Sequence, residues 1–176
     1  MRSVILSFRL LTLLFLLPSF ALATDFSGRI VKEGSLLVDQ EEIKGIYVIL
    51  KVEEVPALVV LLHSDGSINR SGTGALDNKE REMFIGVTDP TLFLKMRSQV
   101  TEDLLQWIGV RVDPQPKGKV CELTIGFMLA NGKEQGIHVK YGSESLGPPP
   151  EVRRFVISMV EAPDPWYEDF KAKTAK

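Results

Sequence analysis

The stretch from residue 57 to residue 74 places the tightest limit on how this chain can fold. Its first part, Ala57 to His63, is an unbroken apolar run that ends in a histidine. The run is short enough to be a strand, it is rich in Val and Leu, and Asp65-Gly66 follows it. This pattern is typical of a buried strand that enters a tight hairpin. We therefore predict a central strand and then a short polar strand near a sheet edge, with a two-residue turn that places His63 opposite Ile68.

A second predicted hairpin has a register that the sequence constrains further. In residues 121–129 the odd-numbered side chains are apolar, and on the returning strand the apolar set is Ile137, Val139 and Tyr141. A two-residue turn at Asn131-Gly132 would pair Ile125 with His138 and place a histidine on the buried face. We therefore expect either a three-residue loop over residues 131–133 or a bulge at Gly136.

Helix starts are marked by proline. Asp89-Pro90 supplies an N-cap acceptor and a proline at the first helical position, and an amphipathic pattern follows it. Pro150 opens a second amphipathic stretch, and Asp164-Pro165 repeats the start signal near the C-terminus. The fold class that results is α+β: an antiparallel sheet of about five or six strands with amphipathic helices packed on one face.

The first 23 residues have the pattern of a secretory signal peptide. Arg2 and Arg9 make the start positive, residues 10–17 are apolar, Pro18 follows, and Ala21-Leu22-Ala23 is a small-residue cleavage motif. The alternative is a membrane anchor, but a spanning helix needs about 20 apolar residues and this stretch is shorter. We predict cleavage after Ala23, a single globular domain over residues 24–176, a secreted or periplasmic location, and no membrane association after cleavage.

Composition and charge exclude some classes of partner. The chain has 176 residues, of which 44% are hydrophobic and 25% are charged, and these are globular proportions. The formal net charge is -2, and the lysines and arginines are scattered rather than gathered in a stripe. We therefore expect no binding to nucleic acid or to an anionic membrane surface.

Cys121 is the only cysteine, so no intramolecular disulfide can form. Its place in the alternating apolar pattern of residues 121–129 predicts that it packs as a small hydrophobe on the buried face of a strand. The alternative is a reactive or intermolecular thiol.

The order of hairpin, helix, hairpin and helix from residue 57 to residue 162 is similar in layout to small secreted protease inhibitors and cystatin-like modules. The similarity is one of order only. The Gln-x-Val-x-Gly signature of cystatins is absent from this sequence, so no site residue is transferred.

Candidate site residues are few. His63 and Asp65 have a His-x-Asp spacing at the end of the predicted central strand, and Asn69 and Arg70 lie on the arm that follows. A metal site needs three or four ligands and no second cluster is visible, so we expect no metal ligand and no cofactor. Asn69-Arg70-Ser71 also fits the N-glycosylation pattern.

The function expected from these observations is that of an exported, non-enzymatic binding or interaction module with a protein or a ligand as partner. The motifs of serine hydrolases, phosphate-binding loops and calcium loops are not matched in the sequence. The alternatives are a small exported hydrolase with a site near the 63–74 hairpin, and a structural component of the cell envelope.

Overall fold

The computed structural model describes residues 38–77 and 82–174, and its centre is one seven-stranded sheet in the order β4-β3-β2-β1-β6-β7-β5. The predicted signal peptide lies outside the described residues. The elements follow in chain order: the 3-10 turn η1 (Gln40–Glu42), β1 (Ile43–Val52), β2 (Val55–His63), β3 (Ser67–Gly72), β4 (Phe84–Val87), α1 (Pro90–Arg97), α2 (Glu102–Leu105), β5 (Gly109–Val112), β6 (Val120–Leu129), β7 (Glu134–Gly142), α3 (Pro150–Glu161) and α4 (Asp164–Thr174).

The α+β class is confirmed, but the predicted sheet was wrong in its strand count and in being purely antiparallel. The missed strand is β5, which pairs in parallel with β7 and makes the sheet mixed. Its sequence is only four residues long, and Gly109 is its first residue. The strand β2 is interior, as expected, while the middle of the sheet is β1, which pairs with β2 on one side and β6 on the other.

The first hairpin forms as predicted, but with a register that differs by one residue. Ile68 lies opposite Leu62 rather than His63. The reason is the loop: Gly66 has a φ of 89°, and its N–H donates to the carbonyl of His63 at 3.0 Å. The loop therefore holds three residues, 64–66, where a two-residue turn was expected.

The register of the second hairpin is confirmed. Ile125 lies opposite Ile137 and Leu123 lies opposite Val139, so both apolar sets face the core. The loop contains three residues, as predicted, but they are 130–132 rather than 131–133. Gly132, with a φ of 75°, takes the left-handed position at its end.

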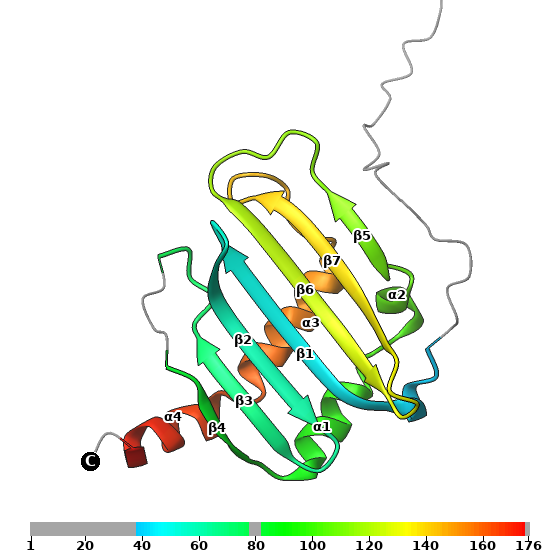
Figure 1. Ribbon diagram of the computed structural model, residues 1–176, viewed down its shortest axis with the longest axis vertical. Helices are drawn as coiled ribbons and strands as arrows, with labels where there is room; N and C mark the ends of the chain where they lie inside the picture. The colour runs from blue at the N-terminus through cyan, green and yellow to red at the C-terminus, as the bar shows by residue number, and fades with distance from the viewer. Residues whose placement is uncertain (1–37, 78–81, 175–176) are drawn as a thin grey trace, which may run out of the picture.

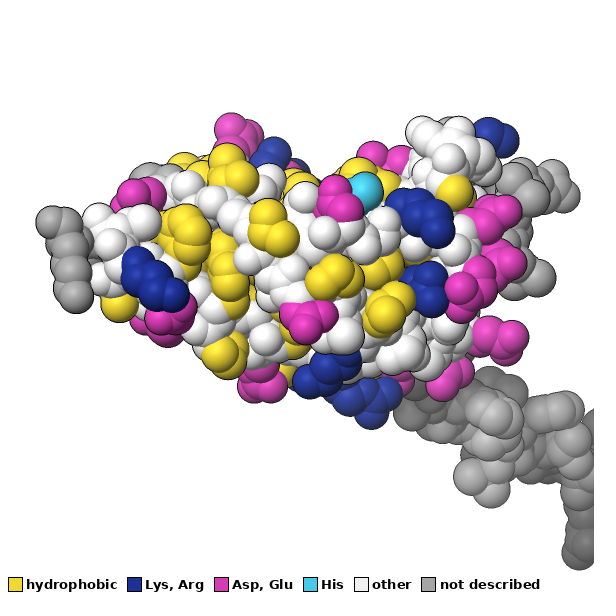
Figure 2. Space-filling model, turned by 90° about the horizontal axis from the view of Figure 1, so that it is seen from below, with side chains coloured by type: hydrophobic (Ala, Val, Ile, Leu, Met, Phe, Trp, Pro, Cys, Tyr) yellow, Lys and Arg dark blue, Asp and Glu magenta, His cyan; other side chains and the backbone are white. Residues whose placement is uncertain are grey.

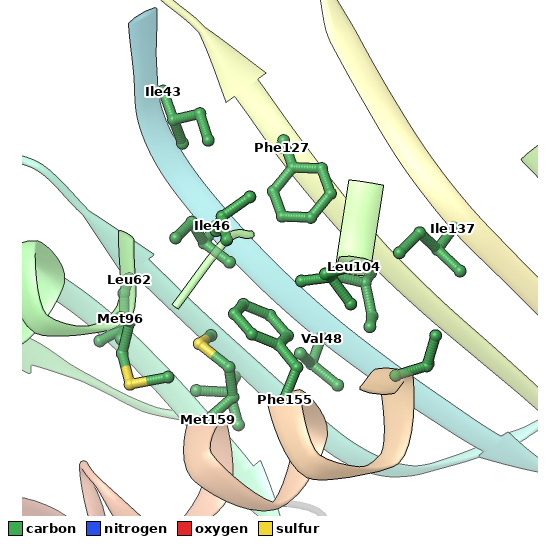
Figure 3. Close-up of a cluster of buried hydrophobic side chains, with 14 of the residues drawn as sticks. Ile43, Ile46, Val48, Leu62, Met96, Leu104, Phe127, Ile137, Phe155 and Met159 are labelled. Carbon is green, nitrogen blue, oxygen red and sulfur yellow. The ribbon is translucent and has the colours of Figure 1, made fainter. Parts of the chain in front are cut away.

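The core forms where alternate side chains of the strands, on one face of the sheet, pack against the apolar sides of the helices (Figure 3). Helix α1 contributes Phe93 and Met96, and helix α3 contributes Val152, Phe155 and Met159 to the same buried cluster. Figure 1 shows α3 crossing behind the strands of the sheet. The large core side chains drawn and labelled in Figure 3 are Ile43, Ile46, Val48, Leu62, Met96, Leu104, Phe127, Ile137, Phe155 and Met159.

The predicted helix starts at Pro90 and Pro150 are confirmed. Before α1, the Oδ1 atom of Asp89 accepts a hydrogen bond from the backbone N–H of Thr91 at 2.8 Å, which caps the helix. Helix α4 begins at Asp164. Within residues 38–77 and 82–174, none of the helices combines the length and the apolar character that crossing a membrane requires.

Candidate functional site

The strand positions that alternate with the core make up what we call the second face of the sheet. Some of them carry apolar side chains that are not fully buried. Ile49, Val59 and Leu61 are half-buried, and Ile85 and Val87 on the edge strand β4 are 66% and 71% exposed. We call these five residues the apolar strip. It has members in β1, β2 and β4: Val59 lies opposite Ile49, and the polar Asn69 of β3 lies between Leu61 and Ile85.

The structure brings His63 and Asp65 together at the end of β2. The Nδ1 atom of His63 lies 3.2 Å from the Oδ1 atom of Asp65. The same Oδ1 atom accepts a hydrogen bond from the backbone N–H of Ser67 at 2.8 Å. The hydrogen bonds from Ser67 lower the pKa of Asp65 most, and the nearby imidazole lowers it further. The result is an ionised carboxylate that faces one nitrogen of the His63 ring.

Gly45 of β1 lies between His63 of β2 and Met128 of β6, and directly opposite each of them. A Cβ atom placed on Gly45 would meet the ε-methyl carbon of Met128 and would lie 3.2 Å from the Cδ2 atom of His63. The side chains of His63 and Met128 therefore approach the same glycine from the two neighbouring strands.

Arg70 does not share a face with His63. Its side chain is 2% exposed, and its Nη1 atom donates to the carbonyl oxygens of Gly72 at 2.5 Å and Ser71 at 3.2 Å. The guanidinium also lies 4.8 Å from the centre of the Tyr167 ring in α4. Arg70 therefore ties strand β3 to the C-terminal helix, whereas its neighbour Asn69 belongs to the second face.

Tyr47 and Glu134 form a pair that the sequence did not predict. The Tyr47 hydroxyl donates to the Oε1 atom of Glu134, and the ring lies over Gly126, where any Cβ atom would clash with it. Burial and the nearby Glu134 raise the pKa of Tyr47 to about 12. The only signal in the sequence was a glycine inside a strand, which often marks a close approach by another group.

The β6–β7 part of the second face carries further polar pairs. His138, which the register argument placed on the polar face, has its Nδ1 atom 3.3 Å from the Oγ1 atom of Thr124. The Nζ atom of Lys140 donates to Glu122 at 2.7 Å. This part of the face is therefore polar, whereas the β1–β4 part carries the apolar strip together with polar residues such as Asn69 of β3.

Figure 2 shows the molecule from below the view of Figure 1, which is the end where β2 finishes. On this surface, hydrophobic side chains lie between acidic and basic ones. In the described part of the chain, no group of three or more His, Cys, Asp and Glu side chains is placed to hold a metal ion.

Comparison with protein-family models, with curated proteins and with solved structures finds no match to this chain.

Proposed function

We propose that this protein is an exported, non-enzymatic binding module that holds a protein partner on the second face of its sheet. In this proposal the helices pack on one face only, and the apolar strip is the centre of contact. The observation that carries the proposal is the exposure of Ile85 and Val87 in line with half-buried Leu61 and Val59. Exposed apolar side chains that gather on one face of a protein among polar groups mark interaction sites.

The test is capture of a partner by the chain that begins at residue 24. We expect the wild-type chain to retain a specific protein from the exported fraction of its host. The double variant Ile85→Glu with Val87→Glu should lose this partner, because two carboxylates would have to be buried without counter-charges. Both positions are exposed, so the variant should fold normally.

The matched control is Leu146→Glu, which also places a carboxylate on an exposed leucine, 84% exposed, in the loop before α3. It should retain the partner as the wild type does. Retention by the double variant, loss by the control, or failure of the wild-type chain to capture any protein would contradict the proposal.

The export of the chain is part of the same proposal, and it rests on the arginines, the apolar run and the Ala21-Leu22-Ala23 motif of the first 23 residues. We expect the chain recovered from the exported fraction to have a mass that lacks residues 1–23. A chain that keeps its first residues, or that stays in the cytoplasm, would contradict it.

A second candidate function is that of a small exported hydrolase with its site near the 63–74 hairpin. The observation that favours it is the 3.2 Å approach of His63 to the ionised Asp65, since such a pair can accept a proton from a nucleophile. Hydrolysis of ester or peptide substrates by the mature chain, lost in both His63→Gln and Asp65→Asn, would support this candidate. Activity that both variants retain would count against it.

A further inference from the structure

We propose that His63 and Met128 form a binding site for a soft monovalent metal ion of the Cu(I) class. The proposal is independent of the apolar strip and of any partner protein. The sequence predicts no metal ligand because it shows no cluster of three or four His, Cys, Asp and Glu, whereas a soft monovalent ion can be held by two ligands. A thioether is a further soft ligand, and together with imidazole it suits Cu(I).

The arrangement of three strands brings the two side chains close together. Neighbouring strands lie about 4.8 Å apart, so side chains two strands apart are ordinarily kept apart by the side chain between them. Here the residue between is Gly45, which has none. The Met128 ε-methyl carbon and the Cδ2 atom of His63 both approach the position that a Cβ atom of Gly45 would take. The methyl end of the Met128 side chain and the imidazole edge are therefore neighbours above one glycine.

The position of the imidazole also favours the site. Its Nδ1 atom lies 3.2 Å from the Oδ1 atom of Asp65, although the contact does not have hydrogen-bond geometry, and the other ring nitrogen, Nε2, is left for a ligand. Nε2 is bonded to Cδ2, the ring atom that lies beside Gly45 and the methionine. A carboxylate is a common neighbour of the second nitrogen of a metal-ligating histidine.

The pair of side chains is accessible from solvent. The His63 side chain is 39% exposed and Met128 is half-buried, so an ion can reach the pair from solvent. The bulge in β1 between Ile43 and Gly45 sets the glycine opposite Met128. Bulges re-aim side chains in this way and often lie beside functional sites.

The experiment is a titration of the mature chain with Ag(I), which has the same ligand preference as Cu(I) and does not change oxidation state. The chain carries a ¹³C label on its methionine methyl groups. We expect one Ag(I) per chain and a shift of the Met128 methyl signal together with the ring signals of His63. The methyl signals of Met83, Met96 and Met159 should not move, since these residues lie just before β4, in α1 and in α3.

Variants separate this site from other soft-metal ligands in the chain. His63→Gln and Met128→Leu should each abolish the site, and Asp65→Asn should weaken it about tenfold. His138→Gln and Met83→Leu are the matched controls and should bind as the wild type does. Cys121→Ala should also bind normally, because the thiol is 1% exposed and packs with Val52 and Ala57 in a separate cluster.

Three outcomes would overturn the proposal. In the first, Ag(I) leaves the Met128 methyl signal of the folded wild-type chain unmoved, a readout that needs no variant. In the second, the Cys121→Ala or Met83→Leu variant loses binding while His63→Gln keeps it. In the third, the chain prefers Zn²⁺ to Ag(I), since a site that includes a thioether favours the softer ion.

Discussion

The Nη2 atom of Arg70 lies 3.4 Å from the Oδ1 atom of Asp164, and this contact joins a buried arginine of strand β3 to the first residue of the C-terminal helix. The arginine is 2% exposed while Asp164 is 45% exposed, so the two partners differ in their environments. Most of the compensation for burying the guanidinium comes from the carbonyl oxygens of Ser71 and Gly72 and from the Tyr167 ring.

Replacement of Arg70 should therefore destabilise the fold far more than loss of a surface ion pair. We expect Arg70→Ala to lower the free energy of unfolding by about 3 kcal/mol, because it leaves a cavity and buried carbonyl groups without their donor. The control is Arg97→Ala, which removes a pair with the exposed Glu41 and should cost less than about 1 kcal/mol. Urea unfolding measures both, and equal effects would contradict this account.

The two hairpin glycines should differ in how they tolerate alanine. Gly132 has a φ of 75°, and nothing lies within 4 Å of the place that an added Cβ would take, so Gly132→Ala should cost only the left-handed backbone, about 1 kcal/mol. At Gly66 the φ is 89° and the added carbon would lie 2.5 Å from the carbonyl oxygen of Thr88. We expect Gly66→Ala to lower the free energy of unfolding by at least about 1 kcal/mol more. The order of the two values in urea unfolding is the check, and the reverse order would contradict it.

Two tyrosines should make the fold sensitive to alkali. Burial and Glu134 raise the pKa of Tyr47 from 10.0 to about 12, and burial raises the pKa of Tyr141 to about 12 as well. Since the folded state favours the neutral phenols, their stabilising effect is complete below pH 10 and is lost as the pH rises from 10 to 12. The free energy of unfolding, measured by urea titration across this range, should fall.

The variant Glu134→Gln separates the two groups. It removes the carboxylate beside Tyr47, so the pKa of Tyr47 should move down toward 10.0 while that of Tyr141 stays near 12. A pH titration of phenolate absorbance follows both. An unchanged titration curve in this variant would show that Glu134 does not act on Tyr47 in solution.

The Cys121 thiol should react slowly with thiol reagents in the folded protein. It is 1% exposed, and burial, followed by the charge of Glu53, raises the pKa of the thiol, so both access and the thiolate fraction are reduced. We expect the labelling rate to rise sharply in denaturant and to follow the unfolding transition. Fast labelling of the folded chain would favour a reactive thiol instead.

Short-range patterns in the sequence determined much of the fold. The apolar alternation of residues 121–129 and 137–141 was sufficient to require a loop that keeps both sets on one face, and the pairs Ile125–Ile137 and Leu123–Val139 form as expected. The proline-marked helix starts were equally local, because a cap and a fixed φ act within one turn. The register of the first hairpin was predicted wrongly by one residue. Its second arm is polar, so no alternation of apolar residues fixed which residues lie opposite each other.

Other features depended on segments far apart in the chain. The strand β5 forms because its four residues pair with the edge of β7. A run that short has no strand preference of its own. Arg70 was a candidate binding residue on a polar arm, but in the fold it is 2% exposed and its guanidinium lies against Tyr167 of α4, a contact between segments far apart in the chain. His63 and Met128 lie beside the same glycine because β1, which carries Gly45, lies between their strands. The order of strands in the sheet decides this proximity, and the spacing of the residues in the sequence does not.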